Sequence, residues 1–164
     1  MALNAYLLLK GQKQGDIHGG VTQKGRENTI LVHGFDNQMA VPLDAASGLP
    51  TGKRQHRPLS IVKEVDQSSP KLWTAVVNNE TLTTWVLRFW AADAAQGGIE
   101  KQIYTVTLTN ARIVSMHEFM SDNQDPAQAK LPLQEQISFT YQKIEWTWMN
   151  PTVVAADDWE SPVV

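Results

Sequence analysis

The side chains that most often carry out chemistry are spread thinly along this chain. Its four histidines, His18, His33, His56 and His117, lack the spacing of metal ligands. His117 and Glu118 begin like a zinc-protease helix, but His-Glu-Phe-Met-Ser lacks the second histidine of that motif. There is no cysteine, no nucleophile elbow, no phosphate-binding loop and no dinucleotide fingerprint. We therefore predict no catalytic, metal or cofactor site, and we do not expect an enzyme.

One dense basic cluster lies at the end of a segment that is rich in glycine and proline. The cluster consists of Lys53, Arg54, His56 and Arg57. The many breakers in residues 34–57 predict a long loop, and a loop of this length in a compact domain is usually functional or disordered. The cluster suits contact with an acidic surface on a neighbouring molecule. A solvated basic loop is the alternative, and the residues by themselves favour it.

A strip of uncharged polar residues alternates with apolar residues nearer the C-terminus. Its members are Gln134, Gln136, Ser138, Thr140 and Gln142. An ordinary solvent face usually carries more lysine and glutamate, so the strip suits a wet surface that does not hold cargo tightly, or an interface between subunits. An ordinary exposed face is the remaining alternative.

Most of the chain alternates apolar and polar residues, which is typical of antiparallel β-strands. We expect strands over residues 2–10, 28–33, 58–65, 83–90, 99–110, 112–119 and 133–148. The last strand changes phase near Gln142 and Lys143, which predicts a bulge or a strand shared between two sheets. Ser69 as the cap and Pro70 in the first turn predict one helix. Residues 150–164 are expected to be irregular, with Trp159 anchoring them.

Length and composition indicate a single domain over residues 1–164. The chain is 42% hydrophobic and 19% charged, which is typical of globular proteins. Its formal net charge of -3 argues against nucleic-acid binding, which usually needs a clustered positive field. The first residues lack the basic leader of a signal peptide, and no segment approaches the ~20 apolar residues of a membrane span. We expect a cytoplasmic start without membrane insertion, and a dedicated route if the protein is exported.

Short motifs along nearly the whole chain resemble one protein family. They are Ala5-Tyr6-Leu7, Gly15-Asp16-Ile17-His18-Gly19, Ser47-Gly48, Thr51-Gly52 with Arg54, His56-Arg57-Pro58, Lys63-Glu64-Val65-Asp66, Ser68-Ser69-Pro70-Lys71-Leu72 and Ile144-Glu145-Trp146-Thr147. Each motif alone is unspecific, but their order and spacing resemble the Hcp proteins, which build the inner tube of the bacterial type VI secretion system. The turn at residues 93–98 and the loop at residues 121–131 depart from the family pattern.

The resemblance implies an all-β fold with one α-helix, a small β-barrel formed by two antiparallel sheets. It also implies hexameric rings that stack into a tube, capped by a VgrG-type spike and driven by a contractile sheath. Such rings carry effector proteins, and the tube is secreted without a cleaved signal peptide. A closed ring needs a heterologous interface, in which one patch meets a different patch. We expect edge strands and the helix to supply the lateral contacts.

The resemblance also suggests roles for particular residues. The loop at residues 34–57, with Lys53, Arg54, His56 and Arg57, and the turn with Gly97 and Gly98 are expected to reach one neighbouring ring. Asp157 and Asp158 would be offered on the opposite face, because an acidic tail complements a basic loop. Gln134, Gln136, Ser138 and Thr140 are expected to line the lumen.

Two hypotheses from other functional classes remain open at this point. A stand-alone β-barrel module for a sugar or lipid ligand predicts a monomer with an apolar internal pocket. A hydrolase with an unrecognised site predicts convergent titratable groups with perturbed pKa values.

Overall fold

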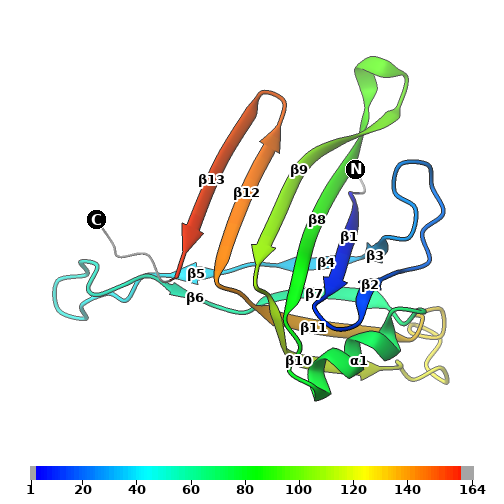
Figure 1. The fold of residues 1–164 in the computed structure, drawn as a ribbon, viewed down its shortest axis with the longest axis horizontal. Coiled ribbons are helices and arrows are strands. Elements are labelled where there is room, and N and C mark those ends of the chain that lie inside the picture. Colours follow the sequence, from blue (N-terminus) through cyan, green and yellow to red (C-terminus); the bar gives the residue numbers. More distant parts are fainter. Residues whose placement is uncertain (1–2, 160–164) are drawn as a thin grey trace.

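The computed structural model describes residues 3–159, which form two antiparallel β-sheets with one α-helix beside them (Figure 1). The larger sheet has seven strands in the order β13-β12-β9-β8-β1-β2, and β3 also pairs with β1. Its strands are β1 (Asn4–Gly11), β2 (Gly15–Ile17), β3 (Ile30–Val32), β8 (Leu82–Asp93), β9 (Ile99–Thr109), β12 (Lys143–Met149) and β13 (Thr152–Asp158). A short 3-10 turn, η1 (Ala94–Gln96), joins β8 to β9.

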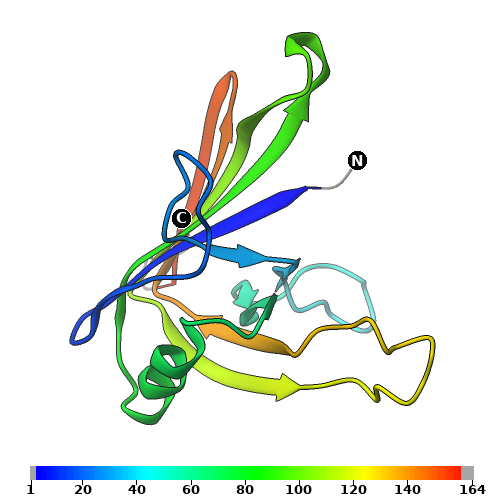
Figure 2. The ribbon, with the colours of Figure 1, turned by 90° about the vertical axis from the view of Figure 1, so that its right-hand side faces the viewer.

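The smaller sheet has four strands in the order β10-β11-β7-β4. They are β10 (Arg112–Phe119), β11 (Gln134–Thr140), β7 (Leu59–Glu64) and β4 (Gly34–Asp36). Two very short strands, β5 (Met39–Ala40) and β6 (Gln55–His56), pair with each other outside both sheets. The helix α1 (Ser69–Val77) packs near β10. Figure 2 shows that the two sheets converge on the side where α1 lies and diverge away from it.

The core lies between the two sheets, because the alternating strands of each sheet turn their apolar side chains toward the other. Trp85 of β8 is fully buried and meets Phe139 of β11 edge to face, with ring centroids 5.4 Å apart. Leu72 and Ala75 of α1 join the same cluster. The helix therefore closes the edge of the core at which the sheets converge.

The predicted fold class is confirmed, with one difference in how the barrel is completed. Within residues 3–159 the chain forms two antiparallel sheets and one α-helix, as expected. The two sheets keep separate hydrogen-bond ladders, so the barrel is open where they diverge. The predicted phase change near Gln142 is also confirmed, because β11 belongs to the smaller sheet and β12 to the larger one.

The helix begins one residue earlier than the capping pattern predicted. Ser68 is the cap residue and makes no capping hydrogen bond with its side chain. Ser69 lies inside the helix, and its hydroxyl accepts from the backbone N–H of Asp66 at 3.0 Å and donates to Glu135 at 2.7 Å. The buried carboxylate of Glu135 thus draws Ser69 away from the capping role, since a hydrogen bond to an ionised group is stronger than one to a neutral group.

Two segments that were expected to be irregular contain strands. Residues 34–57 contain the short strands β4, β5 and β6, of two or three residues each, within the predicted loop, and no long regular element. Residues 152–158 form β13, which pairs with β12 from Met149↔Thr152 to Lys143↔Asp158, and residues 160–164 lie outside the described chain. Most of β13 is exposed on both faces. A strand of this kind shows no period of two in its sequence, because that period arises from burial of one face.

Candidate interaction surfaces

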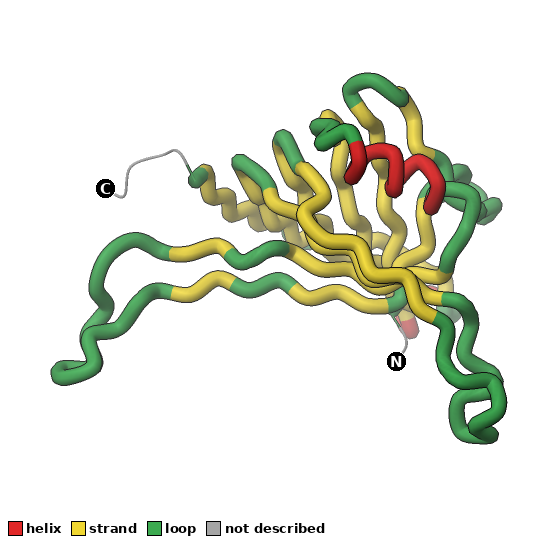
Figure 3. The backbone as a smooth tube through the Cα atoms, turned by 90° about the horizontal axis from the view of Figure 1, so that it is seen from below, coloured by secondary structure: helices red, strands yellow, loops and turns green. Residues whose placement is uncertain are grey.

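Residues 37–57, here called the arm, leave the body of the molecule as a narrow ribbon (Figure 3). Near the body, Met39 pairs with His56 and Ala40 with Gln55, and farther out Leu43 bridges to Pro50. His56 is the only buried residue of the arm, with 8% of its surface exposed. The arm has no core of its own, so contacts at its base must hold it in place.

Three residues from distant parts of the chain meet at the base of the arm. Asp157 Oδ2, near the end of β13, accepts a hydrogen bond from Arg54 Nε and lies 2.5 Å from His56 Nε2. Arg54 Nη2 also donates to the backbone carbonyl of Asp158 at 2.9 Å. On its other side, His56 Nδ1 lies 2.8 Å from the hydroxyl of Tyr141, and the ring of Trp159 lies over the imidazole at 4.6 Å.

The ionisation of these groups follows from their contacts. The hydrogen bond from Arg54 holds the pKa of Asp157 below its ordinary value, and His56 adds to this effect. An ionised carboxylate only accepts hydrogen bonds, so His56 Nε2 carries a proton. Burial, with the nearby charge of Asp157, raises the pKa of Tyr141 to about 12.

The line of Tyr141, His56 and Asp157 resembles a hydroxyl–histidine–carboxylate triad in outline only. The phenol stays protonated at neutral pH, because its pKa is raised rather than lowered, and Tyr141 is only 6% exposed. A substrate could not reach this hydroxyl without moving the arm. The geometry is that of a structural contact between the arm and β13.

The residues predicted from the sequence to make stacking contacts fall into three groups. Arg54, His56 and Asp157 come together within one protomer, and so does the backbone of Asp158. Lys53 and Arg57 are exposed on the arm. Gly97 and Gly98 follow η1 at the tip of the β8–β9 hairpin, with left-handed φ angles of 70° and 85°. This tip lies far from the arm in Figure 1.

The residues predicted to line a lumen share one face of β11. Gln136 and Thr140 are exposed, Gln134 and Ser138 are half-buried, and the alternate residues Glu135, Ile137 and Phe139 are buried. Across the sheet, the hydroxyl groups of Ser138 and Ser60 form a hydrogen bond at 2.8 Å. The strip is therefore the outward face of the smaller sheet.

An apolar groove opens where the larger sheet projects beyond the smaller one. It is lined by Leu3, Phe35, Phe89, Ile103, Tyr104 and Trp148. Leu3 is 55% exposed and Trp148 is 46% exposed, which is a large exposure for side chains of this size. Exposed apolar patches on soluble proteins typically mark interaction sites.

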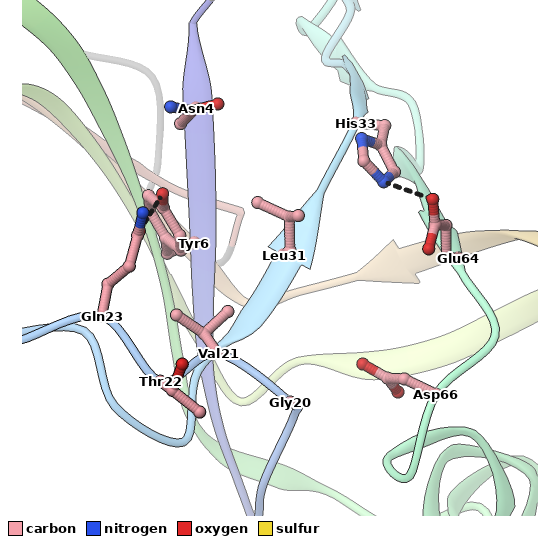
Figure 4. A pocket seen from close by; sticks show the side chains of 10 residues that line it. All are labelled: Asn4, Tyr6, Gly20, Val21, Thr22, Gln23, Leu31, His33, Glu64 and Asp66. Atoms are coloured by element: carbon pink, nitrogen blue, oxygen red, sulfur yellow. Dashed lines mark hydrogen bonds and ion pairs between the residues drawn. The ribbon is translucent and has the colours of Figure 1, made fainter.

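A second, more polar cavity lies beside β1 and β3 (Figure 4). The imidazole of His33 and the carboxylate of Glu64 face each other across one side of it at 3.5 Å, and Tyr6 donates to Gln23 at 2.7 Å on the other side. Behind Tyr6, Arg26 stacks over the rings of Tyr6 and Trp90 and pairs with Glu100 at 2.5 Å. These contacts join residues up to 74 positions apart, so no local sequence pattern could have predicted them.

The part of the chain that the structure describes contains no group of three or more histidine or acidic residues that could hold a metal ion. Over the same residues, no helix is both long enough and apolar enough to cross a membrane.

Together, the fold and its surfaces define a small two-sheet β-protein with one helix, a projecting arm and an exposed apolar groove. Comparisons with known proteins identify the family. Residues 6–148 match the family model described as "Type VI secretion system effector, Hcp". The chain therefore belongs to the Hcp family, which confirms the resemblance found in the sequence.

Individual relatives cover almost the whole chain. The "Major exported protein" of Pseudomonas aeruginosa is 37% identical over 172 residues, and the match covers 99% of each protein. A crystal structure of an Hcp protein has a TM-score of 0.89 at 25% identity and covers 98% of this chain and 100% of its own. The Hcp1 protein of E. coli EAEC 042 has a TM-score of 0.84 at 30% identity, covering 96% and 99%. These matches do not support a sugar- or lipid-binding module.

Proposed function

We propose that this protein is a structural, non-enzymatic subunit of the inner tube of a type VI secretion system. Residues 1–164 act as one domain, six copies close into a ring, and rings stack around a hollow centre that carries effector proteins. The observation that supports this most directly is membership of the Hcp family together with an exposed apolar groove on a single copy. The name of its relative, a major exported protein, supports secretion. In this proposal the rings assemble in the cytoplasm beforehand.

The lateral contact of the ring would join the apolar groove of one copy to a different patch on the next. A ring requires such unlike surfaces. The helix offers a candidate second patch, because Trp73 is 37% exposed and Val77 is 80% exposed. Both patches would then bury apolar surface in the same contact. Such burial is the main driving force for association.

Stacking of rings would use the arm and the tip of the β8–β9 hairpin. Arg54 and His56 are engaged by Asp157 within one copy, so the exposed cations Lys53 and Arg57 are the better candidates for contact with the next ring. Gly97 and Gly98 give the hairpin tip a tight backbone without side chains, which suits close approach. Asp158 at the end of β13 is a candidate acidic partner in the neighbouring ring.

The outward face of the smaller sheet would face the lumen through Gln134, Gln136, Ser138 and Thr140. Uncharged polar side chains keep the surface of the lumen hydrated, so cargo proteins pass without binding tightly. The tube would end in a VgrG-type spike and would be pushed by a contractile sheath, which are partners implied by the family.

Light scattering coupled to size exclusion, followed by electron microscopy, tests the ring. We expect a hexamer with a central hole. Trp148→Ser should shift the purified protein toward monomers, because it removes apolar surface from the groove. Leu43→Ser is the matched control, since Leu43 is 63% exposed far out on the arm, outside both patches. A wild-type protein that stays monomeric at high concentration would refute the proposal.

Charge reversal tests the stacking contact separately. Lys53→Glu with Arg57→Glu should leave hexamers intact but prevent tubes. Lys24→Glu with Lys130→Glu makes the same change in net charge on exposed loops and should leave tubes unaffected. If both double variants formed tubes equally well, Lys53 and Arg57 of the arm would not take part in the stacking contact.

Chemical labelling tests the lumen. Gln136→Lys introduces one amine on the outward face of the smaller sheet. An amine-reactive probe too large to enter the tube should label it quickly in isolated rings and slowly in capped tubes. Equal labelling rates in the two states would place this face outside the lumen.

A further inference from the structure

The contact between the arm and β13 joins two segments that otherwise share few constraints. The arm is an exposed ribbon whose single buried residue is His56. The residues of β13 are also mostly exposed, and within the larger sheet this strand pairs only with β12. The arm is therefore weakly held by its own packing, whereas β13 has a full ladder to β12 but little burial. Their mutual contact is thus an important constraint on the arm and on the end of β13.

The contact is concentrated on one carboxylate. Asp157 Oδ2 accepts hydrogen bonds from both Arg54 Nε and His56 Nε2. Arg54 Nη2 also donates to the backbone carbonyl of Asp158. The side chain of His56 is 1% exposed, and that of Asp157 is 21% exposed. If the carboxylate were removed, His56 Nε2 would remain almost fully buried without its acceptor, which is costly.

Aromatic residues on both sides complete the contact. Tyr141, at the corner between β11 and β12, bonds to His56 Nδ1, and Trp159 covers the imidazole. The backbone N–H of Trp159 donates to the carbonyl of Gln142 at 2.9 Å. The same imidazole thus touches the corner between the sheets and the residue that follows β13.

We propose that Arg54, His56 and Asp157 form a latch through which the end of β13 and the arm control each other's position. With the latch closed, the arm keeps the direction seen in Figures 1 and 3, and β13 is held on β12 up to Trp159. A molecule that engages the end of β13 and competes for Asp157 loosens the arm. By the same reciprocity, a pull on the arm loosens the end of β13. This inference does not depend on the role in a tube.

Hydrogen exchange measured on the full chain, in whatever assembly it forms, tests the latch. Asp157→Asn keeps the size of the side chain but removes its charge. We expect amide exchange to speed up by about tenfold or more both in residues 37–57 and in residues 152–159, with no change in β8. Asp122→Asn is the control, because it removes the same charge at an exposed loop position outside the latch.

A second variant approaches the latch from the other side. Arg54→Lys keeps the positive charge but loses the planar group that reaches Asp157 and the carbonyl of Asp158 together. It should also speed exchange in residues 152–159, although the substitution lies in the arm. Faster exchange in the arm alone would show that the contact is local and would overturn the proposal. Equal effects of Asp157→Asn and Asp122→Asn would also overturn it.

The position of the arm can be measured directly, because the chain has no cysteine. Spin labels on Leu49→Cys and Thr109→Cys, which are exposed sites on the arm and at the end of β9, report one intramolecular distance when labelled copies are diluted with unlabelled ones. The distance distribution should be narrow in the wild type and broad with Arg54→Lys or Asp157→Asn. An unchanged distribution in both variants would overturn the latch.

Discussion

Lys63 and Glu135 form an ion pair that is completely buried between β7 and β11. The two residues are direct partners across the smaller sheet, and both side chains have 0% exposure. The ammonium group of Lys63 also lies 3.1 Å from Asp66, and Glu135 accepts from Ser69 at the start of α1. The pair therefore ties the sheet to the first turn of the helix.

Breaking this pair from one side should be far more costly than replacing both partners. Lys63→Met alone leaves the buried carboxylate of Glu135 without a counter-charge and should lower the free energy of unfolding by about 3–5 kcal/mol. Glu135→Leu alone leaves Lys63 with Asp66 as its remaining counter-charge, so it should cost less. The double variant should cost less than Lys63→Met, because no fully buried charge remains. Urea denaturation of the three variants measures this difference, and simple additivity of the single effects would contradict it.

Glu80 should make the protein sensitive to acid. It is 5% exposed and accepts hydrogen bonds from the backbone N–H groups of Lys13 and Gln14 at 2.7 and 3.0 Å. Burial by itself raises the pKa of Glu80, but the hydrogen bonds from Gln14 and Lys13 outweigh it, so the pKa lies below its ordinary value.

A lowered pKa means that Glu80 stabilises the fold above its ordinary pKa and loses this effect as the pH falls through its folded value. Unfolding of the wild type and Glu80→Gln should therefore differ most at neutral pH and converge below about pH 4. Asp122→Asn, at an exposed loop position, is the control and should leave the pH profile unchanged. A constant difference between wild type and Glu80→Gln across this range would contradict the expectation.

Two adjacent glycines should respond in opposite ways to the same substitution. A Cβ atom on Gly19 would lie 2.4 Å from the carbonyl oxygen of Thr29 and 2.7 Å from the Cα of Ile30, whereas one on Gly20 would meet nothing within 4 Å. Gly19→Ala should destabilise by about 1–3 kcal/mol through overpacking. Gly20→Ala should be neutral or slightly stabilising, because it restricts the unfolded chain. Thermal unfolding of both variants measures the difference, and equal melting temperatures would contradict it.

The fold should tolerate loss of the indole N–H of Trp85 but not loss of the volume of its side chain. Its indole N–H is buried and has no hydrogen-bond partner among the described residues. Trp85→Phe removes that unpaired donor and should cost much less than Trp85→Ala, which should cost about 3–5 kcal/mol by leaving a cavity beside Phe139. Similar losses from both variants, measured by denaturation, would show that the indole ring edge is itself essential.

Local patterns predicted the elements whose residues have one buried face. The strands at residues 99–110 and 112–119 agree closely with β9 and β10, and the phase change at Gln142 marked the corner between the sheets. Their signal is strong because alternate burial imposes a period of two on the sequence. The same reasoning missed β13, whose residues are mostly exposed, and β5 and β6, which have two residues each and are too short to show a period.

The charged residues show the same contrast between what the sequence predicts and what the structure decides. Lys53, Arg54, His56 and Arg57 were grouped from their spacing, and Asp157 was recognised as a complementary charge. Which of them pair within one copy depends on where β13 lies. Asp157 meets Arg54 because the β12–β13 hairpin returns the chain to the base of the arm.

By itself, the sequence of this protein determined the all-β class, the single helix, the corner at Gln142 and the family, because these depend on residue types and short spacings along the chain. Only the tertiary structure decided that Lys63 pairs with Glu135, that Arg26 lies between Tyr6 and Trp90, and that Asp157 holds the arm. These contacts join residues 20 to 103 positions apart. Their geometry is fixed by strand order and register, which arise from the packing of the whole core and which no local pattern encodes.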